Sequence, residues 1–348
     1  MKPSDLLKLP KNLRKSYGDL NVADSLDRYE SWLERREQAK TQNDSYDHTE
    51  TVSEYYDLFT ELMQFGWNES LHFAPISKDE SLEEAIIRHQ RHLIQKLELR
   101  EGMTIIDVGC GLGGPLRRIA KESGAKVLGI NNNEHQLQKA KQKTTEAGLD
   151  HLIEYRQCNF MDMSSFEPGS FDAGYAIEST CYAPNKERAF AEIFRVLKPG
   201  SLFWGQEMCL TNVFMPDDER HCAIRDEIKF TLALYDLFTF ERVSQALENV
   251  GFEIIEAKDL EVKGDSSVPW YQPMDGLTSS LRSWLRVPAG RSTLAGGVRL
   301  AEVVGMFPKD SWRVIELLDR QADAYVAGGQ SGIFTPLYCF LARKPETS

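Results

Sequence analysis

One stretch near residue 107 limits the possible folds of this chain more than any other. Residues 105–115 read IIDVGCGLGGP. The apolar residues around a single acid predict a buried strand, and the glycines end that strand where a helix can begin at Pro115. Glycines let a ligand approach the backbone closely, and the free N–H groups of a helix start favour electron-rich or anionic groups. We therefore expect a strand, a ligand-binding turn and a helix.

Two kinds of ligand are compatible with this turn. The spacing of Gly109, Gly111 and Gly114 satisfies the dinucleotide fingerprint, which is a weak indication when it stands alone. The same turn follows motif I of S-adenosylmethionine (SAM)-dependent methyltransferases, in which Asp107 stands two residues before the first glycine and Gly113 belongs to the pattern. A strand-turn-helix without any ligand is the third interpretation, although so many glycines would then weaken the helix start for no purpose.

The next predicted strand helps to decide between the two ligands. It ends in Asn131, Asn132 and Asn133. A dinucleotide enzyme needs an acid or an arginine for the ribose about 20 residues after the glycines, and neither is present there. Asparagine can still donate a hydrogen bond to a ribose. The pattern therefore favours SAM over a dinucleotide.

Composition excludes several classes of function. The 348 residues are enough for one large core with appended elements or for two domains. A formal net charge of −12 argues against nucleic acid as a partner. The first residues lack the apolar core of a signal peptide, and no run of about 18 apolar residues predicts a membrane span. The six cysteines form no C-x-x-C pair, which fits an intracellular, reducing compartment.

Strand and helix patterns alternate from residue 101 to residue 262. Strands are predicted at 104–109, 126–131, 153–159, 171–178, 201–209 and 253–262. Helices are predicted at 115–123, 133–147, 186–197 and 239–250, with further helices at 51–64, 79–98 and 219–235, over much of 276–330 and in residues 1–40. Residues 41–50 are polar and predict a linker, and residues 334–342 predict a final strand that returns to the sheet. The fold class is therefore α/β, a Rossmann-like, doubly wound and mostly parallel sheet.

Several segments resemble the sterol C-24 methyltransferase family over nearly the whole chain. They read FGWNESLHF (65–73), IIRHQRHL (86–93), IDVGCGLGGP (106–115), GINNNEHQLQKAK (129–141), YAIESTCYAP (175–184), VLKPGS (196–201), VPWYQP (268–273) and VAGGQSGIFTP (326–336). The resemblance implies a class I SAM-dependent methyltransferase. It also implies four consecutive parts: an N-terminal helical arm and linker (1–50), a helical substrate cap (51–100), a SAM-binding domain (101–262) and a sterol-methyltransferase C-terminal region (263–348).

The chain departs from the pattern of that family at a few positions. Met63 and Gln64 interrupt its aromatic-acid-aromatic lead-in, and Asn68 replaces a usual glycine. Asn159 stands where the family generally has an aspartate that faces adenine, and Tyr182 stands where a histidine is common. We expect these changes to affect the choice of methyl acceptor more than the binding of the methyl donor.

The resemblance implies which residues hold SAM. Asp107 would orient the glycine turn or the methionine end of SAM, and its alternative role is to cap local backbone N–H groups. One or two of the asparagines at 131–133 would reach the ribose, which is compatible with a helix cap by Asn132 or Asn133. Asn159 is the candidate for the adenine edge. The complete set expected to bind the donor is Asp107, Gly109, Gly111, Gly113, Asn131, Asn132, Asn159 and Phe160.

Aromatic residues predict an apolar pocket for the acceptor. An alkene that attacks a sulfonium methyl becomes a carbocation, and aromatic faces stabilise a desolvated cation by roughly 0.5 to 2 kcal/mol each. Flanking Gly66, Pro269 and Pro273 predict loops for several of these aromatics, although burial in a core would explain any single one equally well. The residues expected to bind substrate are Phe65, Trp67, Phe73, Tyr182, Trp270 and Tyr271.

A carbon nucleophile of this kind needs a base only after methyl transfer, to remove a proton and set the final double bond. Glu178 and Glu207 lie near the carboxyl ends of predicted strands and are the first candidates, with His72 and His89 behind them and Tyr175 as a further pocket residue. Burial in an apolar pocket would raise the pKa of a glutamate, whereas a surface or ion-paired role is the alternative. His89 and His92 lack a convincing third ligand, so no metal is expected.

The resemblance thus implies C-methylation of a sterol at C-24, with a carbocation, a hydride shift and proton loss, and S-adenosylhomocysteine as the second product. One alternative is methylation of another apolar alkene, such as a linear triterpene or a pathway-specific steroid. A second alternative is a SAM- or sterol-binding protein without turnover. An apolar substrate also predicts peripheral membrane association, at the endoplasmic reticulum or lipid droplets in a eukaryote, and a homo-oligomer is conceivable.

Overall fold

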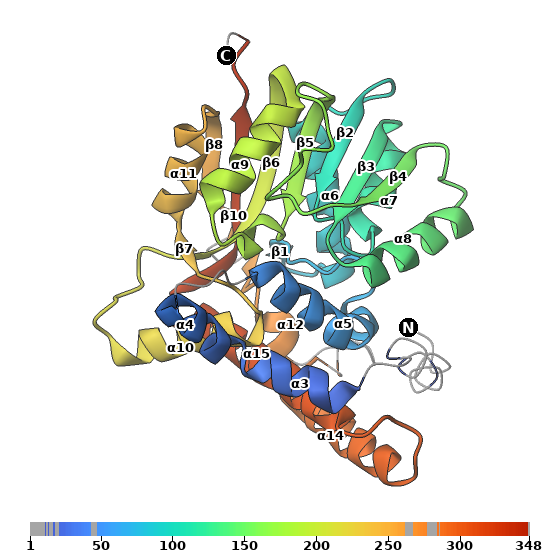
Figure 1. Cartoon of the computed structure of the whole chain (residues 1–348), viewed down its shortest axis with the longest axis vertical. Coiled ribbons are helices and arrows are strands. Elements are labelled where there is room, and N and C mark those ends of the chain that lie inside the picture. The colour runs from blue at the N-terminus through green and yellow to red at the C-terminus, as the bar shows by residue number, and fades with distance from the viewer. Residues whose placement is uncertain are drawn as a thin grey trace. The chain divides into compact units, whose positions relative to one another are not determined.

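The computed structural model describes residues 21–42, 47–261, 267–276 and 286–346, together with Lys11, Leu13, Tyr17 and Trp284 (Figure 1). The chain forms two compact units, and each is discontinuous in sequence. The helical unit consists of Met1–Asn68, Pro216–Leu234 and Tyr271–Gln330, and the sheet unit consists of Glu69–Met215, Tyr235–Trp270 and Ser331–Ser348. These units group the residues differently from the four consecutive parts expected from the sequence.

The sheet unit contains an eight-stranded sheet in the order β4-β3-β2-β5-β6-β10-β8, with β7 paired to β6. Its strands are β2 (Thr104–Val108), β3 (Lys126–Asn131), β4 (Ile153–Gln157), β5 (Phe171–Ile177), β6 (Leu197–Leu210), β7 (Phe238–Thr239), β8 (Glu253–Asp259) and β10 (Phe334–Arg343). The strands from β2 to β7 pair in parallel, whereas β10 is antiparallel to both β6 and β8. A separate ribbon pairs β1 (Ile76–Ser77) with β9 (Ser267–Val268). The predicted α/β sheet is confirmed.

The final strand, β10, lies inside the sheet rather than at its edge. Nine of its ten residues, from Phe334 to Ala342, are buried, as expected for a strand that is covered on both faces. Pro336 cannot donate a hydrogen bond to a neighbouring strand, and the pairing with β6 shifts register between Thr335 and Tyr338, on either side of it. The prediction that the last strand returns to the sheet is confirmed.

Helices cover both faces of the sheet. Alternate strand residues such as Ile105, Tyr175 and Trp204 pack in a cluster with side chains of α6 (Leu82–Lys96), α7 (Gly114–Ser123) and α8 (Glu134–Glu146). Their neighbours Ile106 and Phe203 face the opposite way and pack with α9 (Lys186–Val196) and α11 (Phe240–Asn249). This is the arrangement of a doubly wound sheet, which binds ligands at the carboxyl ends of its strands.

Local capping explains where several helices begin. Ser81 accepts from the backbone N–H of Glu84, while the Glu84 side chain accepts from the Ser81 backbone, so α6 begins with a capping box. Asn133 caps α8 by accepting from the Gln136 backbone N–H at 2.8 Å. Asp47 caps α5, which therefore begins at His48 rather than at the expected residue 51.

The helical unit contains helices from three distant parts of the chain. They are α3 (Val22–Glu30), α4 (Trp32–Gln42), α5 (His48–Trp67), α10 (Glu219–Thr231), α12 (Gln272–Asp275), α14 (Pro288–Val303) and α15 (Ser311–Gln330). Tyr29 is fully buried there between Tyr55 and Phe59, and its hydroxyl donates to the Phe230 carbonyl at 2.6 Å. In the expected linker 41–50, residues 43–46 lie outside the described part. Within the described residues, no helix combines the length and apolarity needed to cross a membrane.

Candidate functional site

The glycine turn connects β2 to α7 as the sequence predicts. Gly109, Gly111 and Gly113 have φ values of +84°, +51° and +69°, a region that side chains other than glycine rarely adopt. A Cβ atom at Gly109 would come within 2.3 Å of the Ser179 Cβ, so packing excludes a side chain there. A Cβ at Gly111 would instead meet only the Gln136 Oε1, at 4.0 Å. The turn is therefore open at Gly111, where a ligand could approach the backbone.

Asp107 lies at the base of this turn and is buried. The hydroxyl of Tyr175, its partner on β5, donates to Asp107 Oδ2 at 3.0 Å. Burial raises the pKa of Asp107 to about 7, although the Tyr175 hydrogen bond acts in the opposite direction. Among the described residues no lysine, arginine or histidine forms an ion pair with Asp107. A buried carboxyl without a protein cation, beside an open glycine turn, fits the cationic methionine end of SAM.

The asparagines after β3 divide between structural and ligand-facing roles. Asn133 is the cap of α8, the structural role that the sequence left open. Asn131 Nδ2 donates to Gln136 Oε1 at 2.9 Å, which fixes the amide next to the glycine turn. The backbone carbonyl of Asn132 accepts from Gln157 Nε2 at 3.0 Å. Asn131 and Asn132 are both partly exposed at the carboxyl end of the strand.

Asn159 and Phe160 follow β4 at the same edge of the sheet. Asn159 Oδ1 accepts from the Met161 backbone N–H at 2.9 Å, a local turn that orients the side chain. Phe160 is half-buried and packs against the core cluster on the α9 side of the sheet. An amide side chain offers the kind of acceptor that an exocyclic amine can meet, which is the chemistry expected of Asn159.

Glu178 immediately follows β5 and precedes Ser179, which packs against the glycine turn. Its φ is +49°, an uncommon conformation for a residue with a side chain and one that is frequent at functional sites. Its carboxyl is buried, and Oε1 accepts from the Phe73 backbone N–H and from Gln206 Nε2, both at 2.7 Å. Burial raises the pKa of Glu178 well above its ordinary value, only partly offset by the Phe73 hydrogen bond.

His72 and His89 belong to the same buried network. His89 Nε2 lies 2.8 Å from Gln206 Oε1, and His72 Nδ1 lies 2.8 Å from the Phe73 carbonyl oxygen. Burial lowers the pKa of His72 to about 4 and that of His89 to about 3, so both rings are neutral at physiological pH. Neither histidine is poised to exchange protons near pH 7.

Glu207 has a different environment from Glu178. Its Oε2 forms an ion pair with Lys186 Nζ at 2.6 Å, and its Oε1 accepts from the Thr180 hydroxyl at 2.5 Å. Lys186 also donates to the Thr180 carbonyl at 2.6 Å. These bonds tie β6 to the first turn of α9 and to the short helix η1 (Thr180–Tyr182).

The expected aromatic residues divide between the two units. In the sheet unit, the Phe73 and Trp270 rings meet edge to face with centroids 5.1 Å apart, and Tyr182 is buried in η1. In the helical unit, the Arg286 guanidinium lies over the Trp67 ring at 5.8 Å, and Tyr271 contacts Gly329 closely enough to exclude a side chain there. The backbone of Phe65 belongs to α5, whereas its side chain lies outside the described part.

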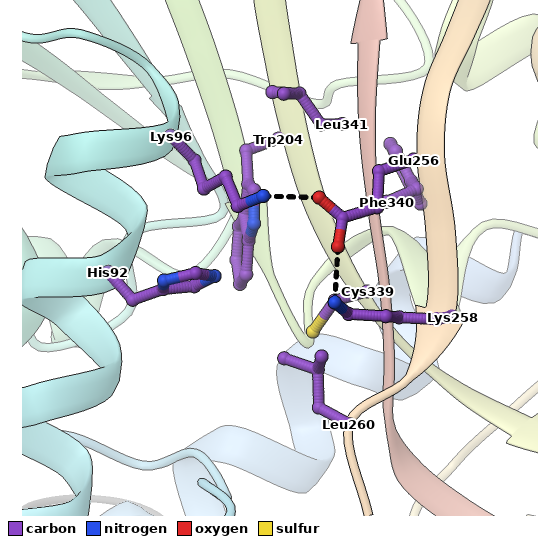
Figure 2. A pocket seen from close by; sticks show the side chains of 9 residues that line it. All are labelled: His92, Lys96, Trp204, Glu256, Lys258, Leu260, Cys339, Phe340 and Leu341. Atoms are coloured by element: carbon purple, nitrogen blue, oxygen red, sulfur yellow. Dashed lines mark hydrogen bonds and ion pairs between the residues drawn. The ribbon is translucent and has the colours of Figure 1, made fainter.

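A small hollow lies elsewhere in the sheet unit, between α6 and strands β6, β8 and β10 (Figure 2). Lys96 reaches from α6 to Glu256, which also pairs with Lys258, and these two lysines lower the pKa of Glu256 to about 2. His92 lines this hollow, whereas His89 contacts Gln206. None of the residues expected to bind donor or acceptor lines it. In the described residues, no group of three His, Cys, Asp or Glu side chains could hold a metal ion.

Sequence reasoning missed Gln206. This side chain is fully buried and links Glu178, His89 and two backbone carbonyls. The available indication was a second polar residue beside Glu207 inside the mostly apolar strand Leu202–Leu210, since buried polar groups are rare unless they are hydrogen-bonded. Sequence reasoning also missed Gln90, a buried polar residue of α6 whose Nε2 lies 2.9 Å from His72 Nε2.

Comparisons with known proteins agree with this geometry. Residues 106–205 match the methyltransferase domain family, and residues 281–346 match the family of the sterol methyltransferase C-terminal region. A crystal structure of the mycolic acid cyclopropane synthase CmaA1 with S-adenosylhomocysteine and CTAB superposes with a TM-score of 0.69 at 16% identity. It covers 86% of this chain and 99% of that chain, and it shows the fold alone. Fold, glycine turn and domain match define a class I SAM-dependent methyltransferase.

Two relatives narrow this class further. Cycloartenol-C-24-methyltransferase 1 of Oryza sativa subsp. japonica is 42% identical over 325 residues, which are 93% of this chain and 92% of the relative. Sterol 24-C-methyltransferase of Saccharomyces cerevisiae is 35% identical over 325 residues, which are 91% of this chain and 84% of the relative. The chain belongs to the sterol 24-C-methyltransferase family, as its sequence segments indicate.

Proposed function

We propose that this protein transfers the methyl group of SAM to C-24 of a sterol side-chain double bond. The observation that carries the proposal is the identity of 42% to a rice cycloartenol-C-24-methyltransferase over 93% of the chain. Cycloartenol is therefore the first acceptor to test. The burial of the Glu178 carboxyl supports a reaction whose last step needs a base shielded from water.

The donor site is the open edge of the sheet. Bound SAM supplies an electrophilic methyl group on a sulfonium. Asp107 stabilises a cationic group by its charge, and Gly111 leaves the backbone accessible. Asn131 and Asn132 supply hydrogen bonds for hydroxyl groups, and the Asn159 amide supplies them for an aromatic base edge. Phe160 adds apolar contact beside Asn159.

The chain's contribution to the last step is the removal of a proton from the methylated acceptor. Glu178 suits this task better than Glu207 because no lysine or arginine among the described residues neutralises it, whereas Lys186 holds Glu207 at 2.6 Å. His72, His89 and Tyr175 contribute by hydrogen bonding within the buried site. The rings of Phe73, Tyr182 and Trp270 in the sheet unit are proposed to contact the acceptor and to stabilise its cation. Phe65, Trp67 and Tyr271, which belong to the helical unit, stay sequence-based candidates for binding the acceptor.

A competition experiment tests the function. The purified chain is incubated with methyl-labelled SAM and equal amounts of cycloartenol, zymosterol, lanosterol and squalene, and the products are identified by mass spectrometry. Label in one sterol supports the proposal and ranks the acceptors. Label in squalene alone would support methylation of a linear triterpene instead, which the altered lead-in at Met63 and Gln64 motivates. Binding of SAM and sterol without release of S-adenosylhomocysteine would support a non-catalytic protein.

Peripheral membrane association is part of the proposal, at the endoplasmic reticulum or lipid droplets if the source is eukaryotic. The end of α14 and the turn after it expose a patch of large apolar side chains, namely Leu300, Val303, Val304 and Met306, with exposed fractions of 51% to 84%. Flotation with phosphatidylcholine vesicles tests this, and replacing Val303 and Val304 with serine should lower the bound fraction. Light scattering tests whether the chain forms a homo-oligomer.

A further inference from the structure

The two oxygens of the Glu178 carboxyl have different environments. Both hydrogen bonds that described residues make to this carboxyl end on Oε1, one from the Phe73 backbone and one from the Gln206 amide. An oxygen that accepts two N–H bonds is stabilised in its charged form, and its lone pairs are occupied. Oε2 is therefore the oxygen that remains available to accept a proton.

The orientation of the Gln206 amide follows from its surroundings. Its Nε2 lies 3.0 Å from the Pro336 carbonyl oxygen and 3.3 Å from the Phe73 carbonyl oxygen, in addition to Glu178 Oε1. All three neighbours are acceptors, so an amide flipped by 180° would place its own oxygen against them. The amide nitrogen must face Glu178, and Oε1 must face His89.

His89 completes this arrangement. Because Gln206 Oε1 can only accept, the Nε2 of His89 must carry the proton and donate to it at 2.8 Å. The pKa of His89 is lowered to about 3 by burial, so the ring is neutral and keeps this role over the working pH range. The ring also packs edge to face on Trp204, with centroids 5.4 Å apart. A neutral donor thus fixes the amide that fixes Glu178.

The backbone of Phe73 is held from a second side. His72 Nδ1 donates to the Phe73 carbonyl at 2.8 Å, and His72 Nε2 accepts from Gln90 Nε2 at 2.9 Å. Gln90 also donates to the Ser70 hydroxyl at 3.1 Å. The peptide N–H that meets Glu178 Oε1 therefore belongs to a segment that is anchored on α6.

We propose that Gln206, oriented by His89, is a positioning residue that holds Glu178 by Oε1 and presents Oε2 as the atom that accepts the proton in the last step. This inference rests on the proposed function. In that step a C–H bond of the methylated cation breaks, its electron pair forms the new C=C bond, and the proton forms an O–H bond with Oε2. The proton passes to solvent after the product leaves.

Replacement of Gln206 by leucine tests the inference. We expect the alkene product to form at least about tenfold more slowly, because a displaced base loses its alignment with the reacting bond. The KM for SAM should change little. Losing an N–H donor to the carboxylate should also raise the pKa of Glu178. In a plot of kcat against pH, the fall in rate on the acid side (the acid limb) should therefore move to higher pH. A larger share of the cation should be captured by water as a methylated alcohol.

A matched control separates positioning from general damage to the fold. Gln321→Leu makes the same change at a buried glutamine of the helical unit, whose Oε1 accepts from the Tyr55 hydroxyl at 3.2 Å. This variant should keep the wild-type acid limb and the wild-type ratio of alkene to alcohol. If Q206L and Q321L give the same acid limb and the same ratio, Gln206 is merely structural and the inference is wrong.

A second variant covers the case in which Q206L does not fold. Gln206→Glu keeps the size of the side chain and brings a second carboxyl to Glu178, so the acid limb should move to higher pH because two close carboxyls resist joint ionisation. An unchanged acid limb in Q206E would overturn the inference. Sterol methylation by the wild type is measured beside both variants, so failure of the proposed function appears as an inactive wild type instead.

Discussion

Glu178 and Glu207 form an informative pair because they share residue type, burial and neighbouring strands. Glu207 forms an ion pair with Lys186 at 2.6 Å and accepts a hydrogen bond from the Thr180 hydroxyl. These two contacts join β6, η1 and α9. Glu178 is met only by neutral donors among the described residues, and its backbone adopts a φ of +49°. Burial alone therefore does not identify a functional carboxyl. A buried carboxyl that forms an ion pair stabilises the fold, whereas a buried carboxyl without a charged partner is a candidate for a catalytic role.

The first way to break this comparison is to remove the charge of Glu178. Glu178→Gln keeps an oxygen for the Phe73 and Gln206 donors but cannot accept a proton. We expect formation of the alkene product to fall by about 10²- to 10⁴-fold, the usual contribution of a general base. The measurement is kcat for labelled alkene product, with SAM affinity by calorimetry as the control. A variant within a few-fold of wild type would mean that another group removes the proton.

The second prediction addresses the paired glutamate through its partner. Lys186→Met should destabilise the protein by about 3 to 5 kcal/mol, because it leaves the Glu207 charge buried without its cation. Urea unfolding measures this change. The matched control is Lys198→Met, which breaks the ion pair with Asp172 at a side chain that is 48% exposed and should cost about 0 to 1 kcal/mol. Equal costs would show that the Lys186–Glu207 pair is not effectively buried.

Asp107 extends the comparison to a carboxyl in the donor site. Its pKa is raised to about 7 from an ordinary 3.8, so its neutral form stabilises the fold fully below pH 3.8, and that stability is lost as pH rises through 7. Without SAM, Asp107→Asn should therefore gain stability relative to wild type between pH 4 and pH 8, by up to about 4 kcal/mol. Urea unfolding across this range measures the gain. A difference that is constant with pH would contradict the raised pKa.

Much of the fold could be predicted from the sequence because it depends on local patterns. Most strands and helices of the sheet lie within a few residues of their expected ranges, although β6 begins at Leu197 rather than at residue 201. The two-residue strand β7 was missed, since two residues carry no periodicity. The position of β10 between β6 and β8 could not be predicted from the sequence either. Hydrophobic alternation shows that a strand is buried but not which strands flank it.

The candidate site was less predictable because its contacts join distant segments. Sequence reasoning named Glu178 and Glu207 on equal terms, since both follow or occupy apolar strands. The two glutamates differ in their partners: Lys186 pairs with Glu207, whereas Gln206, held by His89, contacts Glu178. His89 and Gln206 are 117 residues apart in the chain. The glycine turn was predictable because its strand, turn and helix are contiguous.

The smallest expected effect separates structural from ligand-facing groups within one loop. Asn133 accepts from the Gln136 backbone N–H at 2.8 Å as the cap of α8, so Asn133→Ala should cost about 1 kcal/mol of unfolding free energy. Asn132→Ala leaves that cap intact and should lower SAM affinity while changing stability by less than about 0.5 kcal/mol. Urea unfolding and calorimetry on both variants measure the two effects. If Asn133→Ala weakened SAM binding as much as Asn132→Ala, the helix cap and the ligand contact would not be separate roles in this loop. The contrast between a structural Glu207 and a functional Glu178 would then have no counterpart among these asparagines.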